Sequence, residues 1–139
     1  MSFIGTFHPL LVHFPIALVL AAAGAELLSM ATARQAWRTI AAANIRAGAA
    51  TGVAAAITGW LLASAPFMDA APSVEWHRWV GMAGAVGAVG AALLSSSLSM
   101  SSTRSAFVYR LTLFATALLV AITGHLGGTL VWGANFFRL

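Results

Sequence analysis

Four histidines are the residues of this sequence best suited to bind something, and two of them stand near its start. His8 and His13 lie in the stretch His-Pro-Leu-Leu-Val-His-Phe-Pro at residues 8–15, where a long apolar run begins. His77 and His125 also fall near the ends of apolar segments. Ionisable side chains within membrane segments are rare and mark functional sites by default. A shared cofactor or metal is therefore the first chemistry to consider.

A b-type haem would use two of these imidazoles as axial ligands and needs no covalent attachment. The chain has no cysteine, which excludes thiolate metal sites and covalent haem attachment. We expect His13 and His77 to be the axial pair, with His125 as a competing ligand or as a partner for a propionate or a quinone. Arg78, which follows His77, would then reach a haem propionate.

The remaining histidine and the alternative metal stay open. His8 is expected at the membrane boundary, above the other three. His8 and His13 are five residues apart, about 140° around a straight helix, so they cannot both face one iron, and a second haem could use His8. Zinc or copper held by His13, His77 and His125 is the alternative, although no carboxylate accompanies them within the membrane. Acid–base catalysis has little support, because the carboxylates are few and scattered.

Composition defines the elements that must position these histidines. The chain has 139 residues, of which 60% are hydrophobic and 7% are charged, whereas about a quarter of a soluble domain is charged. A membrane-spanning helix needs roughly 20 apolar residues, so the length allows four spans. We expect them at residues 9–31, 39–63, 74–98 and 106–132. The prediction is a single all-α domain, an integral membrane four-helix up-down bundle.

The distribution of arginines predicts the orientation of this bundle. The side that holds the first and third loops carries Arg34, Arg38, Arg46, Arg104 and Arg110. The opposite side carries only Arg78 and Arg138. This bias places both termini on the outer, periplasmic side of a bacterial inner membrane. The tryptophans expected at that outer boundary are Trp60, Trp76, Trp79 and Trp132, as in an aromatic belt.

Small residues near the histidines would leave room for a flat macrocycle. Gly81, Gly84 and Ala88 follow His77 at intervals that place them on its face of the helix. Such stripes also pack membrane helices that hold no cofactor. We interpret the stripe in the second span, from Gly48 to Gly59, as packing of this kind.

Apart from Glu75 in the first turn of the third span, Glu26 is the one acidic residue within an expected span. It lies toward the inner end of the first span, far from the histidines. An unpaired charge at that depth costs several kcal/mol. We therefore expect a buried ion pair between Glu26 and an arginine at similar depth, Arg46 or Arg110.

Residues 8–16 (HPLLVHFPI) and 124–131 (GHLGGTLV) resemble motifs of a bacterial membrane family catalogued as domain of unknown function 2231. The resemblance covers nearly the whole chain and implies a compact four-helix membrane domain. Members are sometimes joined to cytochrome c-like modules, which implies electron transfer and favours haem. His8, His13 and His125 match by motif, and His77 by position alone. Trp132 departs from the tyrosine-like residue usual in the family at that place.

The expected function is that of a small membrane b-type cytochrome. It would pass electrons near the outer face between quinol, or another partner, and a periplasmic cytochrome. The second hypothesis is a cofactor-free structural or assembly subunit of a membrane complex, because small-residue faces admit other helices. The third is a transition-metal-binding protein. Expected partners are the lipid bilayer and other membrane subunits or further copies of the chain, but not nucleic acid, since no basic stripe lies on a soluble face.

Overall fold

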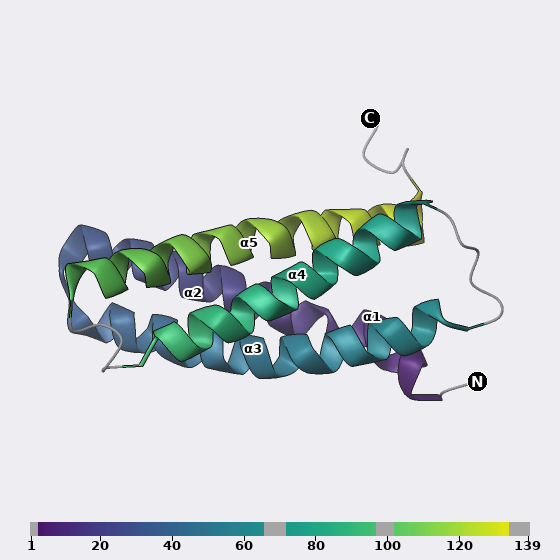
Figure 1. The fold of residues 1–139 in the computed structure, drawn as a ribbon, viewed down its shortest axis with the longest axis horizontal. Helices are drawn as coiled ribbons and strands as arrows, with labels where there is room; N and C mark the ends of the chain where they lie inside the picture. Colours follow the sequence, from purple (N-terminus) through teal and green to yellow (C-terminus); the bar gives the residue numbers. More distant parts are fainter. Residues whose placement is uncertain (1–2, 66–71, 97–101, 134–139) are drawn as a thin grey trace.

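The computed structural model describes residues 3–65, 72–96 and 102–133. Arg138, which entered the expected charge distribution, lies outside these ranges. The elements are a 3-10 helix η1 (Phe3–Phe7) and the helices α1 (His8–Leu11), α2 (His13–Thr32), α3 (Gln35–Ala63), α4 (Pro72–Leu94) and α5 (Thr103–Trp132) (Figure 1). The described residues contain no strand. The predicted all-α fold with four long helices is confirmed, although α4 ends at Leu94, before the expected end at residue 98.

The first span is interrupted at Val12, between α1 and α2. Proline has no N–H to donate, and its ring clashes with the carbonyl group four residues earlier. Pro15 therefore removes the hydrogen bond that Leu11 would accept in a continuous helix. The bonds on either side are kept, from Val12 N to the His8 carbonyl at 3.0 Å and from Ile16 N to the Val12 carbonyl at 3.3 Å. The break lets α1 take its own direction at the end of the bundle.

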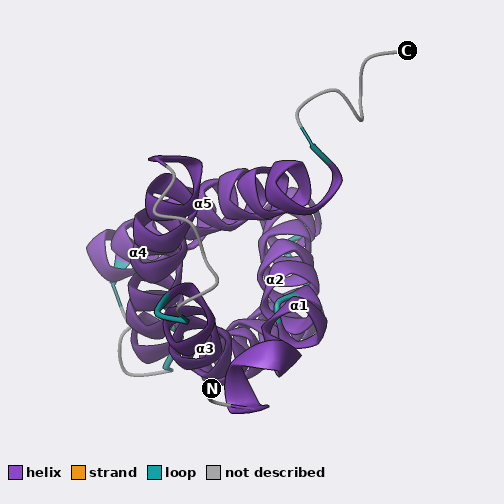
Figure 2. Cartoon of the chain, turned by 90° about the vertical axis from the view of Figure 1, so that its right-hand side faces the viewer, coloured by secondary structure: helices purple, strands orange, loops and turns teal. Residues whose placement is uncertain are grey.

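The four long helices form a ring in chain order. α2 packs on α3, α3 on α4 and α4 on α5, and α5 closes the ring against α2 (Figure 2). The diagonal partners are therefore α2 with α4 and α3 with α5. η1 and α1 pack against α3. The end of the bundle that holds α1, Ala63, Pro72 and Trp132 is called the terminal end below (Figure 1).

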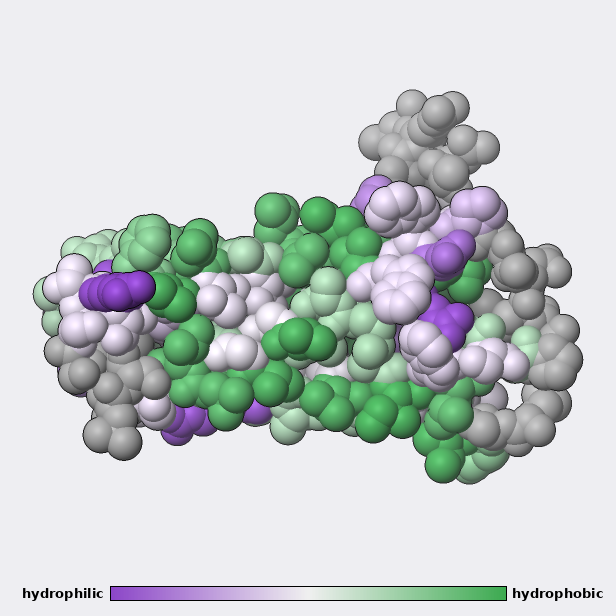
Figure 3. Space-filling model, in the orientation of Figure 1, coloured by the Kyte–Doolittle hydropathy of each residue, from purple (hydrophilic) through white to green (hydrophobic). Residues whose placement is uncertain are grey.

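Among the described residues, three segments are long and apolar enough to cross a membrane: Phe3–Thr32, Gln35–Ala63 and Thr103–Trp132. α4 carries Glu75, His77 and Arg78 in its first turns and is not among them. At 1.5 Å per residue, its 23 residues extend about 34 Å, which still matches an apolar core of about 30 Å. Hydrophobic side chains cover much of the middle of the face in Figure 3, and the most hydrophilic ones lie mainly nearer the two ends. The chain therefore has the surface of a membrane protein.

The core of the bundle is built mainly from small residues, which allow the helices to approach closely. Val19 and Ile45 are fully buried where α2 meets α3. A Cβ atom at Gly48 would lie 3.0 Å from Cγ2 of Val19, and one at Gly87 would lie 2.5 Å from Oγ1 of Thr116. These glycines have no room for a side chain unless the partner moves. Gly48 thus has the packing role expected from its stripe.

Candidate functional site: a histidine pair at the terminal end

His8 and His77 meet at the terminal end of the bundle. Their ring centroids are 6.2 Å apart, and the two ring planes are inclined by 78°. His8 lies on α1, which continues into α2, and His77 lies on α4, the diagonal partner of α2. Both side chains are partly buried. The two imidazoles therefore approach each other across the ring of helices.

α3 holds the imidazole of His8. The His8 Nδ1 atom lies 2.9 Å from the carbonyl oxygen of Ala55 and 3.4 Å from the hydroxyl oxygen of Thr58. That hydroxyl group itself donates to the carbonyl groups of Ala54 and Ala55, each at 3.0 Å. The ring rests on Gly59, where a Cβ atom would come within 2.6 Å of the His8 Cε1 atom. Only glycine leaves space for the ring at that distance.

α5 holds the imidazole of His77 in the same manner. The His77 Nδ1 atom lies 3.1 Å from the carbonyl oxygen of Thr123. The ring rests on Gly127, where a Cβ atom would lie 3.0 Å from the His77 Cε1 atom. In both cases the acceptor is a helix carbonyl group, and the residue four positions later, which lies one turn further along the same face, is glycine. The two halves of the bundle thus repeat one arrangement.

This arrangement fixes which ring nitrogen carries the proton. A carbonyl oxygen can only accept a hydrogen bond, so Nδ1 of each neutral imidazole must be the donor. The lone pair then resides on Nε2 of both rings. Histidines that bind metals commonly donate their other ring N–H to a backbone carbonyl group, which sets the tautomer and the ring orientation. The site therefore offers two oriented imidazoles whose Nε2 atoms can act as metal ligands.

The other two histidines are not part of the pair. His13 and His125 are exposed, although both belong to the terminal half of their helices. The structure thus brings His77 against His8, whereas the sequence favoured His13 as its partner. The described ranges contain no group of three or more His, Cys, Asp or Glu side chains that could hold a metal ion. The expected site of His13, His77 and His125 is not assembled there.

Arg78 is turned toward α3. Its Cζ atom lies 3.3 Å from the ring centroid of Trp60, and the Trp60 and Trp79 rings form an edge-to-face pair with centroids 6.2 Å apart. The expected contact between Arg78 and a haem propionate stays a prediction.

The space that was expected beside His77 for a flat macrocycle is occupied by α5. Cβ atoms at Gly81 and Gly84 would each lie 3.3 Å from a side chain of that helix, Thr123 and Val120 respectively.

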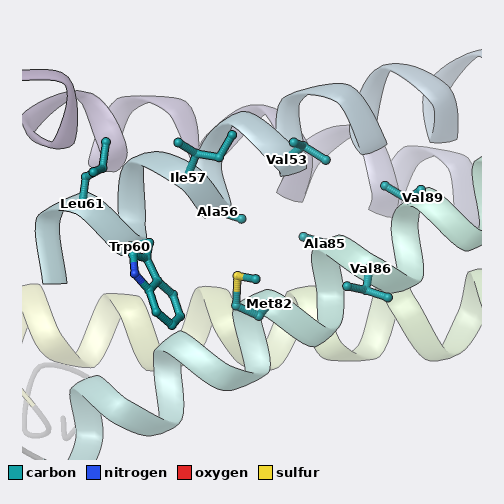
Figure 4. Close-up of a pocket in the computed structure, with 9 residues that line it drawn as sticks. All are labelled: Val53, Ala56, Ile57, Trp60, Leu61, Met82, Ala85, Val86 and Val89. Atoms are coloured by element: carbon teal, nitrogen blue, oxygen red, sulfur yellow. The ribbon is translucent and has the colours of Figure 1, made fainter. Parts of the chain in front are cut away.

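Two hollows lie away from the imidazoles. An apolar groove of about 450 Å³ runs between α3 and α4 on the outside of the bundle (Figure 4). A polar cleft of about 450 Å³ lies at the opposite end and is lined by Ser29, Met30, Ala33, Gln35, Arg38 and Arg110. Neither hollow is lined by a histidine.

The expected ion pair lies near that polar cleft. Glu26 is fully buried, and its Oε1 atom accepts a hydrogen bond of 2.8 Å from Nε of Arg110. The prediction of a buried pair is confirmed, with Arg110 as the partner. Arg46 instead donates to the side chain and the carbonyl oxygen of Ser95, at 3.2 and 3.4 Å. Glu26 thus has a structural partner and lies at the end away from the histidine pair.

Five residues of the histidine site were missed by sequence reasoning: Ala55, Thr58, Gly59, Thr123 and Gly127. Ala55 and Gly59 belong to the stripe interpreted as helix packing. They contribute a backbone carbonyl group and the absence of a side chain, so no functional side chain marks them. The signal that could have found them is the matched spacing, since His8 and Ala55 are separated by 47 residues and His77 and Thr123 by 46.

The fold and the site together define an α-helical membrane protein with an imidazole pair inside one end of the bundle. A family model described as predicted membrane protein (DUF2231) matches residues 5–136. The chain therefore belongs to this family, domain of unknown function 2231. No curated protein and no solved structure matches the chain.

Proposed function

We propose that the protein is a small membrane b-type cytochrome in which His8 and His77 are the axial ligands of a haem. The observation that carries the proposal is the meeting of two imidazoles from α1 and α4, each with Nδ1 held by a carbonyl group. A metal with bonds of about 2.0 Å to an imidazole nitrogen on each side separates two ring centroids by roughly 6 Å. The observed separation of 6.2 Å suits such a ligand pair.

The chemistry of these donors fits a haem. Bis-histidine ligation uses neutral imidazoles, and the Nδ1 hydrogen bonds keep the Nε2 lone pairs available for the iron. A bound haem would supply one-electron transfer, with its potential tuned by its ligands and burial. The glycines at 59 and 127 let each ring lie close to its supporting helix. His8 and His77 would thus orient the cofactor, and α3 and α5 would hold the ligands.

The proposed setting is the bacterial inner membrane, with the terminal end on the periplasmic side. The arginine bias supports this orientation. Trp60, Trp76, Trp79 and Trp132 all lie on helix segments at the terminal end and are at least 40% exposed, as an interfacial belt requires. In this orientation the histidine pair lies near the periplasmic face. Electrons would pass between a quinol or another membrane subunit and a periplasmic cytochrome.

A transition-metal ion held by the same two imidazoles is the second candidate. A single ion needs far less space than a porphyrin, and neither hollow described above is lined by a histidine. Copper or zinc accepts imidazole ligands. The ion would need further ligands from water or a partner, because the described residues offer no third side chain from His, Cys, Asp or Glu.

The test is a haemin titration of the purified protein, followed by absorption, with metal content measured in parallel. Stoichiometric binding with a Soret band and a sharp reduced α-band supports the cytochrome. Colourless protein that takes up one equivalent of copper or zinc supports the second candidate. Protein that binds neither haemin nor metal overturns both and favours a cofactor-free structural subunit.

A further inference from the structure

An apolar groove runs between α3 and α4 on the outside of the bundle. Its lining comes from two antiparallel helix segments, Val53, Ala56, Ile57, Trp60 and Leu61 on α3 and Met82, Ala85, Val86 and Val89 on α4 (Figure 4). Ile57 is 56% exposed and Val86 is 68% exposed, so the groove opens outward. Its first and last lining positions on α4, Met82 and Val89, are seven positions apart, which corresponds to roughly 10 Å along the helix. A linear hydrocarbon chain fits this shape.

The positively charged side chain of Arg78 lies at the terminal end of this groove. Arg78 lies one turn before Met82 and continues the same face of α4, since residues four apart are stacked on a helix. Its guanidinium group packs on Trp60, which lines the groove, with 3.3 Å between Cζ and the ring centroid. Cation–π contacts of this kind strengthen when they are desolvated. The positive charge of Arg78 is therefore held at the terminal end of the apolar groove.

The charge of Arg78 is not compensated by the described part of the chain. No carboxylate in residues 3–65, 72–96 and 102–133 forms an ion pair with Arg78, although Glu75 lies on the preceding turn. The Nε–H group of Arg78 is buried and has no acceptor within these ranges. A guanidinium group at a membrane boundary favours a phosphate group, which accepts charge-assisted hydrogen bonds. The groove and the arginine thus match the two parts of one amphipathic anion.

We propose that the α3–α4 groove binds an anionic phospholipid, with one acyl chain along the groove and the phosphate group at Arg78. A neutral ligand such as a quinol would fill the groove but give the Arg78 guanidinium no anion, and the described residues give it none either. An anion without a chain would leave the apolar lining exposed. The proposal stands apart from the histidine pair, because no histidine lines the groove.

Native mass spectrometry of the full chain in detergent tests this site, with palmitoyl-oleoyl phosphatidylglycerol and phosphatidylcholine as probes. We expect the wild type to retain phosphatidylglycerol about fivefold better, the factor that corresponds to about 1 kcal/mol for one basic side chain near an anionic surface. Arg78→Gln should remove this preference, and Arg78→Lys should keep part of it. Arg104→Gln, an exposed arginine at the opposite end, is the matched control and should change nothing.

A second pair of variants tests the acyl chain. Ala85→Phe places a ring in the groove and should lower retention of both lipids several-fold, whereas Ala83→Phe, on another face of α4, should not. Equal retention of the two lipids by the wild type, or an unchanged preference in Arg78→Gln, would overturn the proposal. Displacement of phosphatidylglycerol by a decyl quinone would assign the groove to a neutral ligand. Displacement by millimolar inorganic phosphate alone would show that no chain is bound.

Discussion

Alanine substitution of individual glycines tests how the imidazoles are held. At Gly59 the added Cβ atom would lie 2.6 Å from Cε1 of His8, so the ring must retreat by about 1 Å to reach an ordinary carbon contact of about 3.5 Å. Ala55 and Gly59 lie one turn apart on α3, and the retreat therefore also lengthens the 2.9 Å bond from His8 to the Ala55 carbonyl group. A bond lengthened by that amount is lost.

The expected displacement of the imidazole differs among the alanine substitutions. At Gly127 the corresponding distance to His77 is 3.0 Å, so its ring must give by only a few tenths of an ångström, and the 3.1 Å hydrogen bond to Thr123 weakens without breaking. Gly128 and Gly24 have nothing within 4 Å of a Cβ atom and serve as matched controls. Disruption should fall from Gly59→Ala to Gly127→Ala, and both controls should resemble the wild type.

Overall stability is a poor measure of this effect. A lost hydrogen bond costs about 0.5–1.5 kcal/mol, while replacing glycine by alanine within a helix contributes about 1 kcal/mol in the opposite direction. At Gly59 the cost of the lost hydrogen bond and the gain from replacing glycine by alanine nearly cancel. At Gly128 only the gain from replacing glycine by alanine applies. The imidazole itself must therefore be observed.

The assay is nitrogen-15 NMR of histidine-labelled protein in micelles without added haemin. The wild type should show the Nδ1-protonated tautomer, with slow proton exchange, for both His8 and His77. Gly59→Ala should lose this signature for His8 only. If Gly128→Ala disturbs the rings as strongly as Gly59→Ala, or if Gly59→Ala leaves the His8 signal intact, the account of how α3 holds this ring is wrong.

Other consequences of the structure can be checked by unfolding and spectroscopy. Arg110→Ala leaves the carboxylate of Glu26 buried without its partner and should cost about 3–5 kcal/mol of unfolding free energy. Glu26→Gln should cost less, because the Arg110 side chain left without a partner is 32% exposed to solvent. Equal losses of unfolding free energy in denaturant titrations of the two variants would contradict this asymmetry. Gly87→Ala should lower the melting temperature, since its Cβ atom would lie 2.5 Å from the Thr116 hydroxyl oxygen, and Thr116→Ala in the same chain should restore it; failure of this rescue would exclude the contact as the cause. His13→Ala should leave haemin binding unchanged, and loss of binding would return His13 to the axial pair.

Much of the architecture could be predicted from the sequence, because it depends on local chemistry. The apolar runs predict four helices. Glu26 predicts a buried ion pair, since an acid at that depth requires a cation. Each of these inferences needs only helix geometry and the cost of burying a polar group.

The partner of His77 could not be predicted in this way. The spacing of His8 and His13 establishes that only one of them can face a given point, but not which one. The choice depends on the break at Val12 and on the packing of α1 against α3, which places His8 on Ala55 and Gly59. Those contacts join residues almost 50 positions apart, and no local pattern records them.

The most direct test of the proposed function is the reduced-minus-oxidised absorption spectrum of the wild type and of four variants, each with one histidine replaced by alanine. We expect a sharp α-band in the wild type, its loss in His8→Ala and in His77→Ala, and its retention in His13→Ala and in His125→Ala. A band that survives in His8→Ala and disappears in His13→Ala would contradict the pairing of His8 with His77. The absence of any band in haemin-loaded wild-type protein would refute the cytochrome itself.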